Sequence, residues 1–509
     1  MSPKKLLLPL ILIFSPFLLF SQTFYHTGSE EYVDSVPLFG ILLAGGQTDN
    51  DDGMRWLTER ANGGDVVVLR ASGSDGYNNY IYSGLGLTVN SVTSIVITSQ
   101  EQANTPEVCE AVANAELIFI AGGNQYNYYS HWKGTCLLDA IHFHVNEKAA
   151  PLGGTSAGLA VLGEVVFTAQ NGSIWTEEAL NNPYHWRMAL SNDFLDVPFM
   201  ENVVTDSHYN NVYGDDNTRY GRHSVFMARM TGEWEMIPRG IGVNEYTAAG
   251  VDENGIVRVF GDPAYPDYAY FHLGNALPEI MEEDTPLTWN NDGNALSVYR
   301  VKGDNDGSNT FDLNDWQTGV GGEWFRWYVE EGELHMEEAS YWNVHFEITR
   351  NQTGEPLEGA EIHLGGLIYR YTDEQGAALF ANAIPQSEIA YTVLLEGYEP
   401  LSGTINVSED GLEVPLEMGI LVSVPRLSED GISLEFGPNP VRDRLYVESS
   451  ADNPLISWSL YDITGKRLTE SQTGNTLSFN VCLAGFAPGI YTMQINTRNG
   501  IVPLKIVRE

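Results

Sequence analysis

The chain has 509 residues, of which 43% are hydrophobic and 18% charged, with 26 Lys and Arg against 68 Asp and Glu. At roughly 150 residues per domain, this length predicts two to four domains, and the hydrophobic content excludes a wholly disordered chain. A net charge of −42 repels phosphate backbones and anionic lipid, which disfavours nucleic-acid binding and a membrane-surface role.

The N-terminus has the pattern of a secretory signal peptide. Lys4 and Lys5 precede an apolar run from Leu6 to Phe20, and Ser21 is a small residue at the expected cleavage position. A membrane span is the alternative, but it needs about 20 apolar residues and this run is shorter. We therefore expect residues 1–21 to be removed on export through the periplasm. The mature protein would then have no membrane span and would be secreted or held at the cell surface.

The first half of the chain alternates apolar strands with helical stretches. Strands are expected at 37–44, 65–69, 94–98 and 117–121. Thr105 and Pro106 predict the start of a helix that runs to about Ala115. Buried strands separated by helices and ended by glycines predict an α/β fold, a mostly parallel sheet with helices on both faces. Ligand sites of such sheets lie at the carboxyl ends of the strands.

The α/β pattern fades after about Gly261, and hairpins are expected to complete a first domain at 37–340. Short strands with frequent turn signals then predict a small all-β sandwich at 343–418. A second all-β sandwich is expected at 430–509.

The three cysteines, Cys109, Cys136 and Cys482, are too few for a disulfide framework, and their spacing does not indicate zinc. Cys109 and Cys136 fall in one expected domain and could pair in an oxidising compartment. Two buried free thiols on helices are an equally good interpretation.

Residues 154–158, Gly-Thr-Ser-Ala-Gly, fit the nucleophile-elbow pattern between an apolar stretch and a helix-compatible run at 159–165. Small neighbours allow the sharp turn that lifts the Ser156 oxygen clear. The turn would also place Ser156 at a helix N-terminus, where the Ala157 N–H can stabilise an oxyanion. An ordinary glycine turn is the alternative.

A catalytic serine needs a base and an orienting carboxylate. A short apolar strand at 203–208 ends in His208, and a glycine-marked strand at 240–245 ends in Glu245. Both side chains are expected at the sheet edge where Ser156 emerges. The chain order Ser, His, Glu argues against the common α/β-hydrolases, which have the order Ser, acid, His. A structural histidine and an ordinary surface acid are the alternatives.

Together, the motifs at 153–158, 206–208 and 240–248 resemble the cyanophycinase branch of the S51 serine peptidases. Residues 121–125 are similar to that family's Gly-Gly-Asp-Gln turn and 295–300 to its C-terminal strand, and the likeness covers about 37–330. The resemblance implies a class I glutamine-amidotransferase-like fold. It also implies Ser156 as nucleophile, His208 as general base and Glu245 as the acid that holds the imidazole.

The same resemblance implies an oxyanion hole made by the N–H groups of Gly123 and Ala157, and no metal or other cofactor. It implies that Gln125 and Asp206 line an aspartate-binding site.

Arg219 and Arg222 match arginines of the family, but they follow a longer Asn- and Asp-rich insertion at 209–218. Guanidinium groups suit carboxylates, so both arginines are candidate substrate-binding residues. Two solvated surface arginines are the alternative.

The resemblance implies cleavage of cyanophycin, a poly-aspartate with arginine on each side chain, to β-aspartyl-arginine. The sequence therefore predicts a secreted serine peptidase that hydrolyses aspartyl bonds through an acyl-enzyme. Ser207, Asn124 and Asn244 depart from the family pattern, which leaves the substrate open. An aspartyl dipeptidase and a weak or inactive surface binding protein are the alternatives. Glutamine amidotransfer is disfavoured because that chemistry uses a cysteine at the elbow.

Residues 343–418 resemble a carboxypeptidase regulatory-like sandwich, through the motifs at 359–362, 372–376 and 391–393. The last 80 residues resemble the C-terminal sorting domain of the type IX secretion route, through 436–440, 460–466 and 488–491. The resemblance implies the type IX machinery as a partner and cleavage of this domain after export.

Two further motifs are weaker indications of a metal site. His142 and His144 are spaced like metal ligands but lack a third ligand, and we expect both at the surface. Residues 304–307, Asp-Asn-Asp-Gly, start like a calcium loop, but Asp315 stands where the bidentate acid is expected to be Glu. A surface turn is the favoured interpretation.

Overall fold

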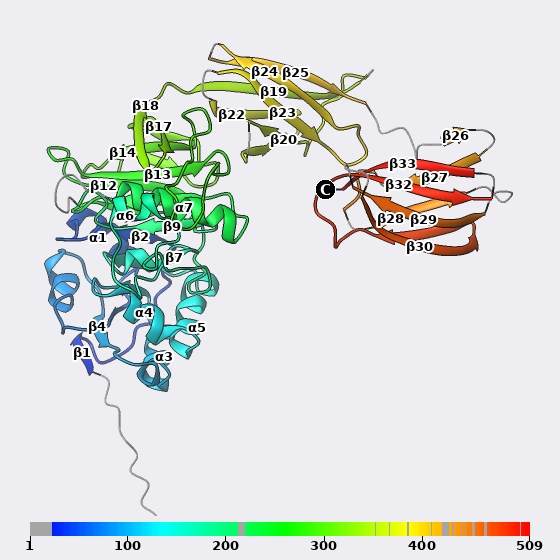
Figure 1. The fold of residues 1–509 in the computed structure, drawn as a ribbon. Coiled ribbons are helices and arrows are strands. Elements are labelled where there is room, and N and C mark those ends of the chain that lie inside the picture. Colours follow the sequence, from blue (N-terminus) through cyan, green and yellow to red (C-terminus); the bar gives the residue numbers. More distant parts are fainter. Residues whose placement is uncertain are drawn as a thin grey trace, which may run out of the picture.

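The computed structural model describes residues 23–508, apart from 212–218, 352, 366, 384–385, 409, 420–426, 430–431, 438, 443, 450–453, 463–465 and 499. The predicted signal peptide lies outside the described residues. The chain forms an α/β domain followed by two β-domains, in sequence order (Figure 1). Within the described ranges, no helix has the length and apolar character needed to cross a bilayer.

The main sheet of the first domain has ten strands in the order β1-β4-β3-β5-β6-β2-β11-β12-β15-β16. The five parallel strands at its centre are β4 (Ser91–Val96), β3 (Asp65–Arg70), β5 (Leu117–Ile120), β6 (Leu152–Thr155) and β2 (Ile41–Ala44). The antiparallel flanks are β1 (Thr23–Gly28), β11 (Ala248–Val251), β12 (Ile256–Phe260), β15 (Thr310–Asp312) and β16 (Gly319–Val320).

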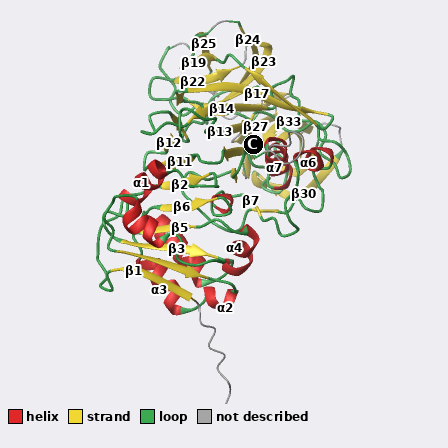
Figure 2. Cartoon of the chain, turned by 90° about the vertical axis from the view of Figure 1, so that its left-hand side faces the viewer, coloured by secondary structure: helices red, strands yellow, loops and turns green. Residues whose placement is uncertain are grey.

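Helices cover both faces of this sheet (Figure 2). One face packs its apolar side chains against α1 (Asp51–Glu59), whose Met54 and Leu57 are buried. The other face packs against α3 (Pro106–Asn114) and α5 (Cys136–His142). The predicted fold class is therefore confirmed. The shorter helices are α2 (Gln100–Ala103), α4 (Gln125–Trp132), the π-helical η1 (Tyr80–Gly84) and η2 (Phe143–Glu147), and the 3₁₀ turn η3 (Leu159–Val161).

A second sheet of six strands, in the order β18-β17-β14-β13-β10-β9, completes this domain. The strands are β9 (Val203–Asp206), β10 (Arg239–Val243), β13 (Tyr268–Gly274), β14 (Leu296–Lys302), β17 (Gly322–Glu330) and β18 (Glu333–Glu338). β9 and β10 are parallel and the other pairs are antiparallel. Its core includes buried side chains of α6 (Thr176–Asn181) and α7 (Tyr220–Glu233). A separate two-stranded sheet consists of β7 (Val166–Phe167) and β8 (Leu190–Ser191). The strands that end before His208 and Glu245 thus belong to a different sheet from β6, which ends before Ser156.

The expectation of a helix at 159–165 is wrong. Only the 3₁₀ turn at Leu159–Val161 follows the elbow, because the chain then joins β9 through a bridge between Val165 and Val204 and enters β7. A side chain at Gly163 would lie 2.6 Å from the Val203 carbonyl oxygen, so the two segments are in close contact. A tertiary contact has therefore overridden a local helical preference.

A disulfide joins Cys109 on α3 to Cys136 on α5, which decides between the two interpretations left open by the sequence. The two helices are thereby linked on the same face of the main sheet.

The expectation of two surface histidines is wrong for His144. This residue is buried in η2, its Nε2 lies 2.9 Å from the Pro151 carbonyl oxygen, and burial lowers the pKa of His144 to about 4. His142 accepts a hydrogen bond from the Asp196 N–H. In the part of the chain that the structure describes, no group of three or more His, Cys, Asp and Glu is placed to hold a metal.

The Asp304 loop is a turn closed by the side chain of Asp304. The Asp304 carboxylate accepts hydrogen bonds from the N–H groups of Asp306, Ser308 and Asn309.

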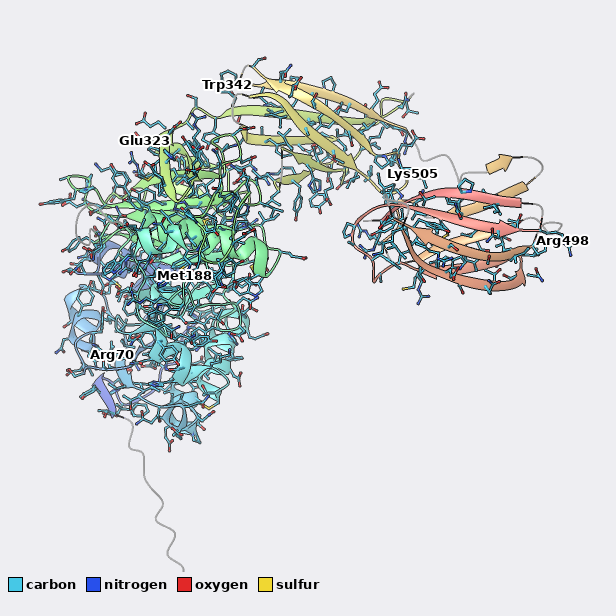
Figure 3. All side chains as sticks on the ribbon, in the orientation of Figure 1. Arg70, Met188, Glu323, Trp342, Arg498 and Lys505 are labelled. Atoms are coloured by element: carbon cyan, nitrogen blue, oxygen red, sulfur yellow. A yellow bond between two sulfur atoms is a disulfide. The ribbon has the colours of Figure 1, made fainter. Side chains whose placement is uncertain are left out.

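Each β-domain is a pair of facing sheets with its own apolar core. The middle domain, which the chain enters at Trp342 (Figure 3), has the sheets β22-β19-β25 and β21-β20-β23-β24. Their bounds are β19 (Trp342–Arg350), β20 (Glu361–Leu364), β21 (Tyr369–Tyr371), β22 (Ala377–Ala383), β23 (Gln386–Leu394), β24 (Leu401–Val407) and β25 (Leu412–Met418).

The last domain has the sheets β26-β27-β28-β31 and β30-β29-β32-β33. Their bounds are β26 (Leu427–Glu429), β27 (Ile432–Gly437), β28 (Arg444–Ser449), β29 (Leu455–Tyr461), β30 (Arg467–Thr476), β31 (Ser478–Cys482), β32 (Gly489–Thr497) and β33 (Gly500–Arg508).

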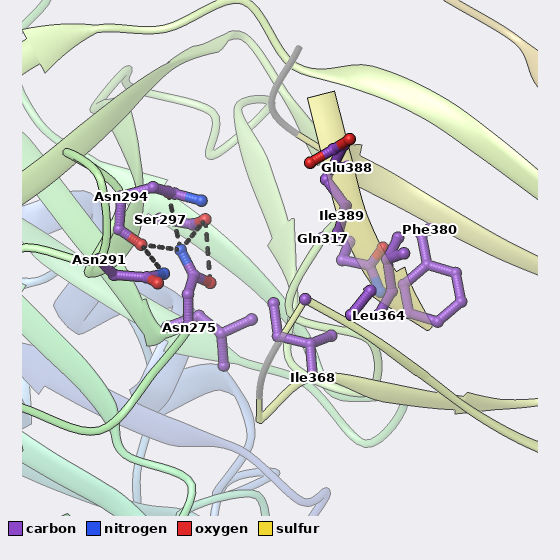
Figure 4. Close-up of a pocket in the computed structure, with 13 residues that line it drawn as sticks. Asn275, Asn291, Asn294, Ser297, Gln317, Leu364, Ile368, Phe380, Glu388 and Ile389 are labelled. Carbon is purple, nitrogen blue, oxygen red and sulfur yellow. Dashed lines mark hydrogen bonds between the residues drawn. The ribbon is translucent and has the colours of Figure 1, made fainter. Parts of the chain in front are cut away.

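The middle domain packs against the first domain, where it contacts the residue after β13 of the second sheet and the loop between β15 and β16 of the main sheet. The Leu367 N–H donates to the Asn275 carbonyl oxygen at 3.0 Å, and the Arg370 guanidinium donates to the Asp315 carbonyl oxygen at 2.8 Å. A cavity of about 250 Å³ lies at this junction (Figure 4). Hydrogen-bonded amides, including Asn275 and Asn294, line its side in the first domain, and apolar residues of the sandwich such as Ile368 line the other.

Candidate active site

Ser156 stands on a strained turn directly after β6. Its φ of +53° is in the left-handed region, which costs a non-glycine residue roughly 1–2 kcal/mol. The glycines on either side are required by close approach: a Cβ at Gly154 would lie 2.4 Å from the Gly158 backbone, and one at Gly158 would lie 2.1 Å from the Ile120 carbonyl oxygen. A strained serine held at a strand end by its surroundings is typical of a nucleophile elbow.

His208 meets this serine from the second sheet. The Ser156 Oγ and His208 Nε2 atoms are 2.7 Å apart. His208 also has a positive φ, +47°, and its N–H donates to the Gly45 carbonyl oxygen at 2.7 Å. A Cβ at Gly46 would lie 2.4 Å from the His208 ring, so the turn after β2 has to be glycine there to admit the imidazole.

Glu245 completes the chain of hydrogen bonds. Its Oε1 lies 2.7 Å from His208 Nδ1. Because a carboxylate can only accept, Nδ1 carries the ring proton, and Nε2 is then the acceptor for the Ser156 hydroxyl. The structure thus brings together the three residues that the sequence placed on distant motifs.

Sequence reasoning missed three residues of this site. The side-chain amides of Asn211 and Gln47 donate to Glu245 Oε1 at 3.0 and 3.1 Å, and the Glu245 N–H donates to Asn210 Oδ1 at 3.0 Å. Asn210 and Asn211 lie in the Asn- and Asp-rich segment at 209–218, which directly follows His208. This position next to a candidate catalytic residue could have marked them in the sequence. Gln47 is 198 residues from Glu245 in sequence, and nothing in its local pattern marks it.

The electrostatic surroundings keep the imidazole available as a base. Burial lowers the pKa of His208, the Glu245 carboxylate partly offsets this, and the positive charge of Arg219 lowers the pKa further. The neutral imidazole, which is the form that accepts a proton, is therefore favoured at neutral pH.

The turn after β5 lies beside the serine. A Cβ at Gly122 would be 3.5 Å from Ser156 Cβ. Neither the Gly123 N–H nor the Ala157 N–H donates a hydrogen bond to any described residue. Gln125, at the start of α4, donates through Nε2 to the Phe167 carbonyl oxygen at 3.1 Å.

Asp206 and Arg222 form a buried ion pair at the end of β9. Arg222 donates through Nη2 to Asp206 Oδ1 at 2.5 Å and through Nε to Oδ2 at 2.8 Å, and its side chain is only 4% exposed. Burial alone would raise the pKa of Asp206, but the charge of Arg222 holds it below its ordinary value. The interpretation of two solvated surface arginines is therefore wrong for Arg222.

Arg219 is more accessible than Arg222. Its side chain is 21% exposed, and Nη1 donates to the Ser207 carbonyl oxygen at 2.7 Å, next to His208 in the chain. Nη1 also lies 3.4 Å from Asp206 Oδ1.

Two family models match the chain. Residues 46–182 match Peptidase family S51, and residues 436–509 match the Secretion system C-terminal sorting domain. Over 257 residues the chain is 27% identical to the cyanophycinases of Synechococcus elongatus and Thermosynechococcus vestitus, which covers 47% of this chain and 74% of each relative.

Two solved structures are also similar. A peptidase from an acI-B1 Actinobacterium is 16% identical, with a TM-score of 0.35, and the match covers 54% of this chain and 98% of that one. A putative peptidase E protein from Listeria monocytogenes EGD-e is 16% identical, with a TM-score of 0.29, and the match covers 44% of this chain and 99% of that one.

The fold and the family match define a serine-type peptidase with a peptidase family S51 domain. The chain is a cyanophycinase homologue that carries a type IX secretion sorting domain at its C-terminal end, which indicates export to the cell surface or beyond. The likeness of the middle domain to a carboxypeptidase regulatory-like sandwich stays a prediction.

Proposed function

We propose that the protein hydrolyses aspartyl peptide bonds with a Ser156–His208–Glu245 triad, and that cyanophycin is its substrate, cleaved to β-aspartyl-arginine. The observation that carries the proposal is the continuous hydrogen-bonded chain from Ser156 Oγ through both ring nitrogens of His208 to Glu245, with both contacts at 2.7 Å. The homology to cyanophycinases supports the choice of substrate.

The proposed reaction passes through an acyl-enzyme. His208 Nε2 takes the Ser156 proton as Oγ attacks the substrate carbonyl carbon, and the N–H groups of Gly123 and Ala157 stabilise the resulting oxyanion. The C–N bond breaks as His208 returns that proton to the leaving amine. Water then attacks the ester with His208 again as base, which releases the acid and restores the serine.

We assign recognition of the substrate aspartate to the side chains next to the triad. Arg219 is the candidate for direct contact with a substrate carboxylate, since it is partly exposed beside His208. Arg222 is bonded to Asp206, and we propose that Asp206, fixed in this way, shapes the subsite by holding Arg219. Gln125 is the proposed polar partner on the α4 side.

Two of the residues that depart from the family pattern, Asn124 and Asn244, have hydrogen bonds of their own. Asn124 caps α4 by accepting from the Tyr126 N–H, and Asn244 donates through its amide to the Pro266 carbonyl oxygen. Neither contact involves Ser156, His208 or Glu245, so both departures are compatible with the proposed triad.

The test is to incubate the purified full-length protein with insoluble cyanophycin and with α- and β-aspartyl dipeptides, and to identify the products by mass spectrometry. We expect β-aspartyl-arginine from cyanophycin. Ser156→Ala should lower kcat by several orders of magnitude, because removing one triad member costs on the order of 10⁴- to 10⁶-fold.

Each other outcome removes a defined part of the proposal. Turnover of dipeptides alone would make the protein an aspartyl dipeptidase, and no turnover of any of them would remove the substrate assignment. Undiminished activity of Ser156→Ala would remove the mechanism. If the native protein turns over none of the substrates and is not labelled by a serine-directed fluorophosphonate, the surface binding role becomes the better account.

A further inference from the structure

Three donors converge on one oxygen of Glu245. Its Oε1 lies 2.7 Å from His208 Nδ1, 3.0 Å from Asn211 Nδ2 and 3.1 Å from Gln47 Nε2. The Glu245 side chain is 16% exposed, so water competes weakly for this oxygen. A carboxylate oxygen that accepts several hydrogen bonds is held in one orientation.

Asn210 and Asn211 bind both the acid and the base. The Glu245 N–H donates to Asn210 Oδ1 at 3.0 Å, and the Asn211 N–H donates to the His208 carbonyl oxygen at 2.9 Å. The first residues after His208 therefore fix Glu245 through its backbone and its side chain. They belong to the Asn- and Asp-rich segment at 209–218.

Tyr209 anchors this segment to the second sheet. It is buried, its N–H donates to the Val243 carbonyl oxygen at 3.1 Å, and its hydroxyl lies 3.1 Å from His272 Nε2. A Cβ at Gly242 would lie 2.5 Å from the Tyr209 ring, so β10 is shaped to receive the ring. Asn211 is thus only two residues from a rigid anchor, which limits how far its amide can move from Glu245.

Building on the triad proposed above, we propose that Asn211 is a positioning residue of the hydrolysis: its amide holds Glu245 Oε1 against His208 Nδ1. Gln47 assists as a second donor from the exposed turn after β2. The hydrogen bonds of Asn211 go to Glu245 and His208 and not to Ser156, so its loss should act on kcat and leave KM nearly unchanged.

The test compares Asn211→Ala, Asn211→Asp and Gln47→Ala with a matched control, Asn146→Ala, which removes an exposed amide that donates to the Asp196 carbonyl oxygen. We expect Asn211→Ala to lower kcat about 10- to 100-fold, the range for one hydrogen bond to a charged group. Gln47→Ala should lower kcat less, and Asn146→Ala should leave it unchanged.

The pH profile separates positioning from a structural role. Glu245, Arg219 and Asp206 are the charged groups that act on His208. Asn211→Asp is nearly isosteric and adds a carboxylate beside the His208–Glu245 pair. It should raise the pKa of His208 and move the acidic limb of kcat/KM to higher pH, which a loss of packing alone would not do.

A nitrogen-15 NMR titration of His208 makes the test independent of turnover. Performed in the Ser156→Ala background, it should report a changed Nδ1–H environment with Asn211→Ala and a raised pKa of His208 with Asn211→Asp.

The positioning role is overturned if folded Asn211 variants keep the native kcat, KM and pH profile while Ser156→Ala is inactive. That outcome leaves the triad standing. Activity that survives Ser156→Ala overturns the triad instead, and the titration then decides whether Asn211 orients Glu245. If Asn211→Ala fails to fold, Asn211→Asp is decisive: an unshifted His208 titration would refute the proposal.

Discussion

At the level of single residues, the site depends on where side chains are absent as much as on where they are present. The imidazole of His208 occupies the space beside Gly46, whose φ of +110° is one that residues with a side chain rarely adopt. The imidazole of His208 can therefore approach Ser156 only because the turn after β2 contributes no Cβ.

We predict that Gly46→Ala lowers kcat at least about 100-fold, because the new methyl group would displace the His208 ring and misplacement of about 1 Å has a cost of that order. Gly134→Ala is the matched control. Gly134 also has a positive φ, +70°, but a Cβ added there would have no neighbouring atom within 4 Å. Gly134→Ala should lose about 1 kcal/mol of stability in thermal unfolding, and Gly46→Ala should lose at least as much because its methyl group also meets the His208 ring. Equal kcat values for the two would show that Gly46 does not shape the site.

Among the helices and strands, the buried pair of Asp206 and Arg222 links β9 to α7 behind the triad. Two charges out of water are stable only while they stay together, and removal of one partner leaves the other uncompensated. The pair therefore makes the end of β9, and with it the position of His208, dependent on the start of α7.

We predict that Arg222→Met lowers the free energy of unfolding of the first domain by about 3 kcal/mol at pH 7, measured by chemical denaturation. In the native protein the pKa of Asp206 is depressed, so the stability from the pair is present above the unfolded pKa and is lost as the pH falls through the folded one. In Arg222→Met, burial raises the pKa of Asp206. Protonation of Asp206 at acidic pH then removes the uncompensated buried charge. The difference in the free energy of unfolding between the native protein and Arg222→Met should therefore decrease toward about pH 4.

Arg326→Met is the control for this effect. Arg326 pairs with Glu337 at the surface, where side-chain exposures are 36% and 42%, and such pairs contribute about 0–1 kcal/mol. A defect in Arg222→Met that is no larger, or that does not depend on pH, would contradict the role given to the buried pair.

Across the molecule as a whole, the candidate site and the sorting module lie in different domains. The first domain holds every residue of the candidate site among those the structure describes, and the last domain matches a sorting module. The middle sandwich is bonded to the first domain through backbone contacts such as Leu367 to Asn275.

We predict that deletion of 436–509 prevents delivery to the cell surface or medium without affecting the peptidase, because the matched sorting module is separate from the triad. Immunoblots of cell fractions from a host with a type IX system would measure this, with activity assayed in the periplasmic fraction. Full-length Ser156→Ala is the control and should be exported normally. Truncated protein in the medium at native levels would count against a sorting role.

Features that depend on neighbouring residues could be predicted from the amino-acid sequence. The small residues at 154–158 predict a tight turn around Ser156 wherever it lies, and the buried apolar runs predict the parallel strands, because both are local properties of the chain. The same reasoning located His208 and Glu245 at strand ends.

Features that depend on residues distant in sequence became visible only in the folded chain. Folding assigns β9 and β10 to a second sheet, reduces the expected helix after the elbow to one turn, buries Arg222 against Asp206, and brings Gln47 and Asn211 to Glu245. Hydrogen bonds and ion pairs across such separations arise from packing, which a local pattern does not encode.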